Sequence, residues 1–358
     1  MANIYSAIIL DNDYWDGAES WAGETSEANR DAKYSTRRFT SMNAWRTDRD
    51  GNSSAADNEY GIIIGPWVTA ESPGFNMTGF NADEAHIVCP VNLPDGVNLA
   101  RHNGIPNDVT NAYVIDAITF GLQFTSSNTL FVVDGIQLDG SITGISTGTN
   151  TSVHITNCIL DGDNVNSNAF AGQSGSDFII TNCVISGQWA RGVYGYIAGT
   201  TYTVYNNTMT TTARASSRGI DCIAAANVYV KNCAVFNNAL TPDIDADADT
   251  IDYCATDDGN GTNGVTLGGS TEWTANFNDY TNKDFTPLEN GDLVGAGVGP
   301  SVDAIVPTTD IIGNPRSGAT CTIGAFEYRA EWAHAFNGIT GFSEINGISI
   351  FTKINEVT

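Results

Sequence analysis

A pair of carboxylates in the segment Asp161-Gly162-Asp163-Asn164 offers the simplest chemistry in this sequence. Glycoside hydrolysis needs two carboxyl groups held at a defined separation across a groove. Asp161 and Asp163 are the best local pair, although Asp-Gly-Asp is also typical of an ordinary turn. They are therefore the catalytic candidates. The four lysines and four histidines are scattered and suggest no base beside them.

Four further aspartates alternate with other residues and suggest a metal site: Asp243, Asp245, Asp247 and Asp249. Alternate residues of a strand point the same way, so these carboxylates would repel one another unless a cation such as calcium bound them. The segment is not an EF-hand, because Ala248 stands where that loop needs glycine. A solvated acidic face remains the alternative. We expect no other cofactor, since the seven cysteines show no zinc spacing.

An aromatic segment suggests a carbohydrate contact. Trp189, Arg191, Tyr194 and Tyr196 lie among glycines between two apolar runs. Aromatic rings at the surface can stack on sugar rings, so these four residues are candidate carbohydrate-binding residues. The alternative is that the rings pack on the protein beneath them.

A repeated phrase supplies the elements that would position these residues. Each copy has apolar residues two and four positions before an Asn or Asp, at residues 134, 157, 182, 206 and 232, giving steps of 23, 25, 24 and 26. A sixth, degenerate copy ends in Tyr253-Cys254. The alternation predicts strands with one buried face, and Asn tolerates the left-handed backbone that would bend the chain. A fixed period of this length predicts stacked coils joined by parallel pairing, with Asn157, Asn182, Asn206 and Asn232 aligned as a structural ladder.

The period and the Asn bend resemble those of the right-handed parallel β-helix, the pectate-lyase-like solenoid, over roughly residues 60–328. Residues 284–328 resemble the closing segment of β-helix repeat proteins of the choice-of-anchor type. The likeness lies in Asp310-Ile311-Ile312-Gly313-Asn314-Pro315-Arg316 and Ile323-Gly324-Ala325-Phe326-Glu327. The resemblance implies that this segment is the last coil, with Asp310 and Arg316 close enough to pair. The Asn-x-Asp, Asp-Asp, Gly-His-Gly and Arg-x-Lys set of the polygalacturonases is not present as a set.

The sequence therefore predicts an all-β chain, a single-stranded right-handed parallel β-helix with a short N-terminal helical cap and a C-terminal β tail. We expect an N-terminal arm of low internal order (1–33), a helical cap (34–60), the β-helix (61–329) and a tail (330–358). In the cap, Thr40 or Ser41 would begin a helix that buries Met42 and Trp45. In the tail, Asn337-Gly338, Asn346-Gly347 and Asn355-Glu356 recur every nine residues. An apolar repeat of this kind needs a partner strand, so we expect it to serve assembly or attachment.

The net charge and the lengths of the apolar runs exclude some classes of partner. The formal charge of −26 disfavours nucleic acid and anionic membranes as partners, and no apolar run is long enough for a membrane span. No secretory signal is evident, which favours folding in a host cytoplasm. The preferred hypothesis is a non-enzymatic structural or adhesion protein of a phage-like virion, forming homo-oligomers or joining other virion or fibre subunits through 330–358, with host or surface polysaccharide as a further partner. The alternatives are a tailspike-type polysaccharide depolymerase or lyase and a processed bacterial surface or extracellular-fibre subunit.

Overall fold

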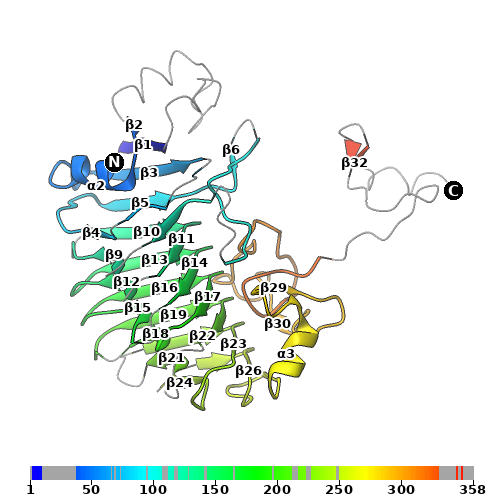
Figure 1. Cartoon of the computed structure of the whole chain (residues 1–358). Helices are drawn as coiled ribbons and strands as arrows, with labels where there is room; N and C mark the ends of the chain where they lie inside the picture. Colours follow the sequence, from blue (N-terminus) through cyan, green and yellow to red (C-terminus); the bar gives the residue numbers. More distant parts are fainter. Residues whose placement is uncertain are drawn as a thin grey trace. The chain divides into compact units, whose positions relative to one another are not determined.

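The computed structural model describes residues 2–9, residues 38–329 apart from short internal gaps, and the pairs 344–345 and 348–349. The gaps are residues 66, 68–69, 73, 94–95, 107–111, 117–119, 128, 141–142, 164–165, 196, 212–216, 223–226 and 247–249. The chain divides into two compact units, Met1–Glu327 and Tyr328–Thr358. The first unit is a stack of coils (Figure 1). From β5 to β24 the chain passes in each coil through one strand of each of three sheets before it reaches the next level.

All strand pairs within these three sheets are parallel in the described residues, as in neighbouring coils of a solenoid. The ten-stranded sheet runs β2 (Arg38–Phe39), β1 (Ala2–Ile9), β3 (Asp57–Ile64), β5 (Glu84–Val88), β10 (Leu130–Asp134), β13 (Ser152–Thr156), β16 (Asp177–Thr181), β19 (Thr201–Tyr205), β22 (Asn227–Lys231) and β25 (Thr250–Asp252). The eight-stranded sheet runs β8 (Val114–Asp116), β11 (Gln137–Asp139), β14 (Ile159–Gly162), β17 (Val184–Gly187), β20 (Thr208–Thr210), β23 (Ala234–Phe236), β26 (Ala255–Thr256) and β27 (Val265–Thr266). The seven-stranded sheet runs β4 (Phe75–Met77), β9 (Phe120–Phe124), β12 (Thr143–Thr147), β15 (Asn168–Ala171), β18 (Arg191–Tyr194), β21 (Arg218–Cys222) and β24 (Ile244–Ala246).

The core consists of side chains stacked in register from coil to coil. On the ten-stranded sheet one buried row comprises Val133, Ile155, Ile180, Val204 and Val230. A second row, four residues before each bend, contains Phe178 stacked on Tyr202 with ring centroids 5.1 Å apart. The alternation seen in the repeat is therefore that of strands with one face buried. The predicted all-β parallel solenoid is confirmed.

The asparagine bend is also present. Asn157, Asn182, Asn206 and Asn232 have φ between 53° and 55°, the left-handed region. Their side chains bond across coils: the amide of Asn157 donates to Asp134 at 2.9 Å, and that of Asn182 donates to Asn157 at 3.1 Å. The degenerate sixth copy follows the same path, because Tyr253 has φ 52°. These four asparagines thus occupy the same bend of successive coils, and a short amide side chain can both bend the chain and bond to a neighbouring coil.

The first copy of the repeat differs from the prediction by one residue. Asp134 pairs in register with Thr156, not with Asn157, and Gly135 occupies the bend with φ 78°. Phe131 and Val133 therefore point inward, in place of the expected Leu130 and Val132. Glycine takes a positive φ without a Cβ penalty, so it replaces Asn at this bend. The sequence pattern could not distinguish Asp134 from Gly135, since both are turn residues.

The N-terminal residues are more ordered than the sequence suggested. Ala2–Ile9 forms β1, which pairs with β3 along its full length, so the predicted low internal order is wrong for these residues. The reason is that Ala7, Ile8 and Ile9 pair with the equally apolar run 62–64, far away in sequence. The remainder of the predicted arm, including Trp15 and Trp21, lies outside the described residues. The expected helix is confirmed as α2 (Met42–Arg49), which Ser41 caps by accepting from the Ala44 amide at 3.0 Å.

After β27 the chain leaves the coil path. Helix α3 (Ser270–Asn276) leads into two antiparallel pairs, β28 (Phe277–Asp279) with β29 (Asp284–Pro287) and β30 (Gly297–Val298) with β31 (Thr320–Cys321). Two other small antiparallel pairs are β6 (Asn92–Leu93) with β7 (Gly96–Val97) and, in the second unit, β32 (Glu344–Ile345) with β33 (Ile348–Ser349). The last pair flanks Asn346 and Gly347, the middle copy of the nine-residue repeat. The rest of the tail lies outside the described residues.

Candidate functional site

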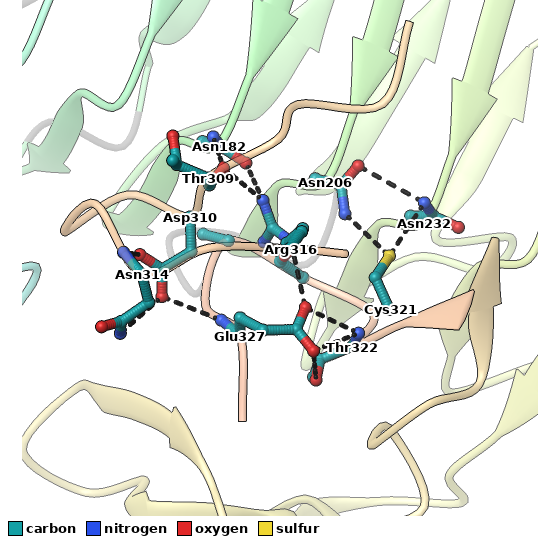
Figure 2. Close-up of polar contacts among 12 residues, drawn as sticks. Asn182, Asn206, Asn232, Thr309, Asp310, Asn314, Arg316, Cys321, Thr322 and Glu327 are labelled. Carbon is teal, nitrogen blue, oxygen red and sulfur yellow. Dashed lines mark hydrogen bonds and ion pairs between the residues drawn. The ribbon is translucent and has the colours of Figure 1, made fainter. Parts of the chain in front are cut away.

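The part of the closing segment that belongs to the first unit, residues 284–327, lies along the asparagine ladder. The expectation that it forms a last coil is wrong: its strands join none of the three sheets, and its residues bond to several earlier coils. The Asn182 amide donates to the Thr309 carbonyl at 2.7 Å (Figure 2), and the Asn232 amide donates to the Val298 carbonyl at 2.8 Å. Asn232 also accepts from the Val298 amide at 2.9 Å. The bend residues thus form hydrogen bonds both to neighbouring coils and to the closing segment.

Arg316 is the central residue of this contact. Its side chain is fully buried and donates to the Thr309 carbonyl, the Gly324 carbonyl and Asn182 Oδ1, and it forms an ion pair with Glu327 at 3.2 Å (Figure 2). Burial lowers the pKa of its guanidinium, and neighbouring anionic groups oppose that shift. The expected pairing with Asp310 is replaced by the pair with Glu327. Five donors in a planar fork suit a site that holds several carbonyls at once.

Asp310 instead organises the tight turn that precedes Arg316. It accepts from the amides of Ile312 and Asn314 at 3.1 and 2.7 Å, and from the Glu327 amide at 3.0 Å. In the motif from Asp310 to Arg316 the two charged residues therefore have separate structural roles: Asp310 holds the turn, and Arg316 binds the closing segment to the coils. Sequence reasoning also missed Arg101, which donates to the Cys89 carbonyl at 2.6 Å and the Ile311 carbonyl at 3.0 Å.

The catalytic candidate Asp161 belongs to a row of aspartates on the eight-stranded sheet. Asp116 and Asp139 end β8 and β11, Asp161 is the last residue but one of β14, and the three pair in register. Neighbouring strands are about 4.8 Å apart, so three carboxyl groups are stacked at that spacing. Sequence reasoning missed Asp116 and Asp139. The available signal was their shared position, since each directly follows Ile or Leu at the same place in the repeat, as Asp161 does.

The row has an uneven charge distribution. Burial, followed by repulsion from Asp161, Asp116 and Asp163, raises the pKa of Asp139 to about 6. Asp161 is neutralised by Lys283, whose ammonium lies 2.6 and 2.7 Å from its two oxygens, and it accepts from the Ser186 hydroxyl at 2.7 Å. Asp163 is exposed beside the row. The structure therefore brings the predicted pair together with two further carboxyl groups and one lysine.

Among the described aromatic candidates, Trp189 does not lie on the expected surface. Trp189 is fully buried and donates to the Leu160 carbonyl at 3.4 Å. Its ring lies against Gly162, where an added Cβ would come within 2.4 Å of a ring carbon, so glycine at that position admits the indole. Arg191 lies over the Tyr194 ring at 4.4 Å and pairs with an aspartate at 2.6 Å. Tyr196 lies outside the described residues. Trp189 is therefore a core residue and the exposed stacking surface is not formed by it.

The predicted calcium residues are only partly described, because Asp247 and Asp249 lie outside the described residues. Asp243 is buried and accepts from the Asn238 amide and the Asp257 amide, each at 2.8 Å. Burial is the first cause that raises the pKa of Asp243 to about 7. Asp245 pairs with Arg218. Both described carboxyl groups thus have protein partners and do not share one open face. Among the described residues no group of three or more His, Cys, Asp or Glu has a metal-binding arrangement.

A cavity of about 290 Å³ lies beside the aspartate row. Its walls come from the outer side of the eight-stranded sheet and from the connection between β28 and β29, with Thr210, Asn237, Tyr280, Thr281, Lys283 and Phe285 among the lining residues. Lys283 therefore faces both the cavity and Asp161.

No helix of the described residues is long and apolar enough to cross a membrane. No family model, curated protein or solved structure matches the chain.

Proposed function

We propose that the chain is a non-enzymatic structural or adhesion subunit, a β-solenoid shaft that joins a larger particle or fibre through residues 330–358. The observation that carries this proposal is the way the closing segment is fastened along the solenoid. Arg316, Asn182 and Asn232 bond segment and coils together, and Arg101 extends the contact to the Cys89 coil. A rod secured along its length by buried polar bonds suits a mechanical role.

The charged residues on the outer faces support the same conclusion. Lys231 pairs with Asp303 at 2.6 Å, and Arg191 of β18 pairs with Asp221 of the next coil, also at 2.6 Å. Asp161, the residue offered for catalysis, is held by Lys283 and Ser186. These groups connect neighbouring segments and are already neutralised. The proposal places the subunit in a virion, phage-like in type, and assigns attachment to the nine-residue repeats of the tail.

Deletion of residues 330–358 tests this proposal. The closing segment ends before the tail, so the truncated protein should fold, with an unchanged far-ultraviolet circular dichroism spectrum, yet fail to enter the native particle. A matched control replaces Asn355 and Glu356 by alanine, which retains two Asn-Gly copies and should retain incorporation. Normal incorporation of the truncated protein would refute the role of the tail.

One observation favours a second candidate function, polysaccharide cleavage of the tailspike type. Asp139 has a raised pKa in a row of carboxyl groups at about one strand spacing, which approaches the separation found in retaining glycosidases. The purified protein would then release oligosaccharides from host capsule. Asp139→Asn should abolish that release, and Asp163→Ala should reduce it. If capsule stays intact in a reducing-end assay, this candidate is removed.

A further inference from the structure

We infer that the cavity beside β28 and β29 binds a neutral sugar residue of a glycan. This inference rests on the adhesion part of the proposed function and names its ligand class. This cavity is a different site from the aromatic segment that the sequence suggested, because it lies between the solenoid and the β28–β29 pair. Thr210 ends β20, Asn237 directly follows β23 in the next coil, and Tyr280 comes from the β28–β29 connection.

The wall that carries Tyr280 is firmly placed. Phe236, on the outer side of β23, stacks on Trp273 with ring centroids 4.2 Å apart. The Phe285 ring meets the Phe236 ring edge-on at a centroid distance of 5.6 Å, and the Tyr280 ring lies 5.8 Å from the Phe236 ring. Such aromatic packing fixes the orientation of rings within a cluster. The β28–β29 connection is thus held against the solenoid, and the cavity is a preformed feature of the fold.

The Tyr280 hydroxyl is buried and has no hydrogen-bond partner among the described residues. Buried polar atoms of folded proteins nearly always have a partner, so each exception needs an explanation. Tyr280 also lines the cavity. A ligand hydroxyl in the cavity would supply the missing partner, because a phenol both donates and accepts.

The size of the cavity selects among ligands. At about 30 Å³ for each water, its volume corresponds to roughly ten water molecules, far more than one bridging water. It lies just below the range of about 300–1,000 Å³ for sites that enclose drug-sized ligands. The exposed side chains of Asn237 and Thr281 lie at the rim, and the buried Thr210 and Phe285 lie deeper. A single ring unit of a longer chain fits these dimensions.

The charges favour a neutral ligand. Lys283 is the cation of the cavity wall, and its ammonium already contacts both oxygens of Asp161. The remaining nearby charge is negative, since repulsion from Asp257 adds to burial in raising the pKa of Tyr280. An anionic sugar would therefore gain no free cation and would approach a protein of net charge −26. Hydroxyl, amide and aromatic groups together match the hydroxyls and apolar C–H face of a neutral pyranose.

Saturation-transfer-difference NMR on the full-length chain tests the inference. The probes are the methyl glycosides of glucose, galactose, mannose and N-acetylglucosamine at millimolar concentrations, with sodium glucuronate as the charged counterpart. At least one neutral glycoside should give signals from its ring protons. Glucuronate should give weaker signals than the neutral glycoside that binds.

Variants then place the site. Tyr280→Phe removes only the hydroxyl and should weaken binding about 2- to 10-fold, the range expected for one hydrogen bond. Asn237→Gly should also weaken binding while preserving the backbone, because Asn237 has φ 53°. The matched control Tyr229→Phe alters an exposed tyrosine on the ten-stranded sheet and should leave binding unchanged.

Absence of binding by every neutral glycoside, preferential binding of glucuronate, or unchanged affinity in Tyr280→Phe would each overturn the inference. The proposed structural role fails by a different result, namely normal particle incorporation after deletion of 330–358. A chain that needs its tail for incorporation but binds no sugar would retain the structural role and lose only the adhesion ligand.

Discussion

Replacement of Arg316 by methionine should release the closing segment from the solenoid. The substitution retains a long apolar stem but removes a guanidinium whose side chain is fully buried. Glu327, whose side chain is 16% exposed, would lose its ion pair, and the carbonyls of Thr309 and Gly324 would lose their donor. Loss of one partner of a buried pair costs about 3–5 kcal/mol, because the other groups stay buried without compensation.

This loss of free energy sets how much faster the backbone amides of the closing segment should exchange with solvent. At about 1.4 kcal/mol for each factor of ten, this loss raises the population of the locally opened segment roughly a hundred- to several-thousand-fold. Amide hydrogen exchange in peptides from 297–327 should accelerate by that factor, provided that opening is local. Peptides of β13 and β16 contain the inward rows of the core and should keep their protection, since their ladder bonds remain.

Two control variants make the result specific. Arg316→Lys keeps the charge but loses the planar fork, so the acceleration should be smaller than in Arg316→Met. Arg329→Met makes the same change at an exposed position and should leave exchange in 297–327 unchanged. Equal exchange in wild-type and Arg316→Met proteins would refute the reasoning. Uniform acceleration through β13 and β16 would show that the segment and the coils unfold together.

Three further predictions concern stability and reactivity. Because the folded pKa of Asp139 is raised to about 6, the folded state loses stability as pH rises through that value, so Asp139→Asn should be more stable than wild type at pH 8 in guanidinium titrations, with the difference vanishing below roughly pH 4. Asn206→Ala should be about 1 kcal/mol less stable than Asn206→Gly in thermal denaturation, because only alanine pays for the left-handed backbone at φ 55°; equal stabilities would contradict this. Ellman's reagent should label none of the seven buried cysteines in the native protein and all seven after denaturation, since burial also raises the pKa of a thiol such as Cys89 to about 12; rapid native labelling would contradict the burial.

The repeat was visible in the sequence because local geometry imposes it. A strand with one buried face needs alternating apolar residues, and a bend with positive φ favours Asn or Gly. Those constraints act within a few residues, so Asn157, Asn182, Asn206 and Asn232 could be found without coordinates. The shift from Asp134 to Gly135 was not visible, because it depends on the register with β13.

The site depended on longer-range packing. Asp116 and Asp139 joined Asp161 only through strand register, and Lys283 reached Asp161 from 122 residues away in sequence. Trp189 looked like a surface residue because its loop is polar and glycine-rich, yet Gly162 of another strand makes room for its ring. Neither relation leaves a mark in the local pattern.

By itself the sequence determined the coil, its period, the four asparagine bends and a helix that begins at Thr40 or Ser41. Only the tertiary structure decided where residues 284–327 lie and which partners Asp161 and Arg316 have. The physical reason is that backbone conformation and side-chain alternation are governed by neighbours in the chain. The burial and pairing of charges are governed by whichever distant segment packs against them.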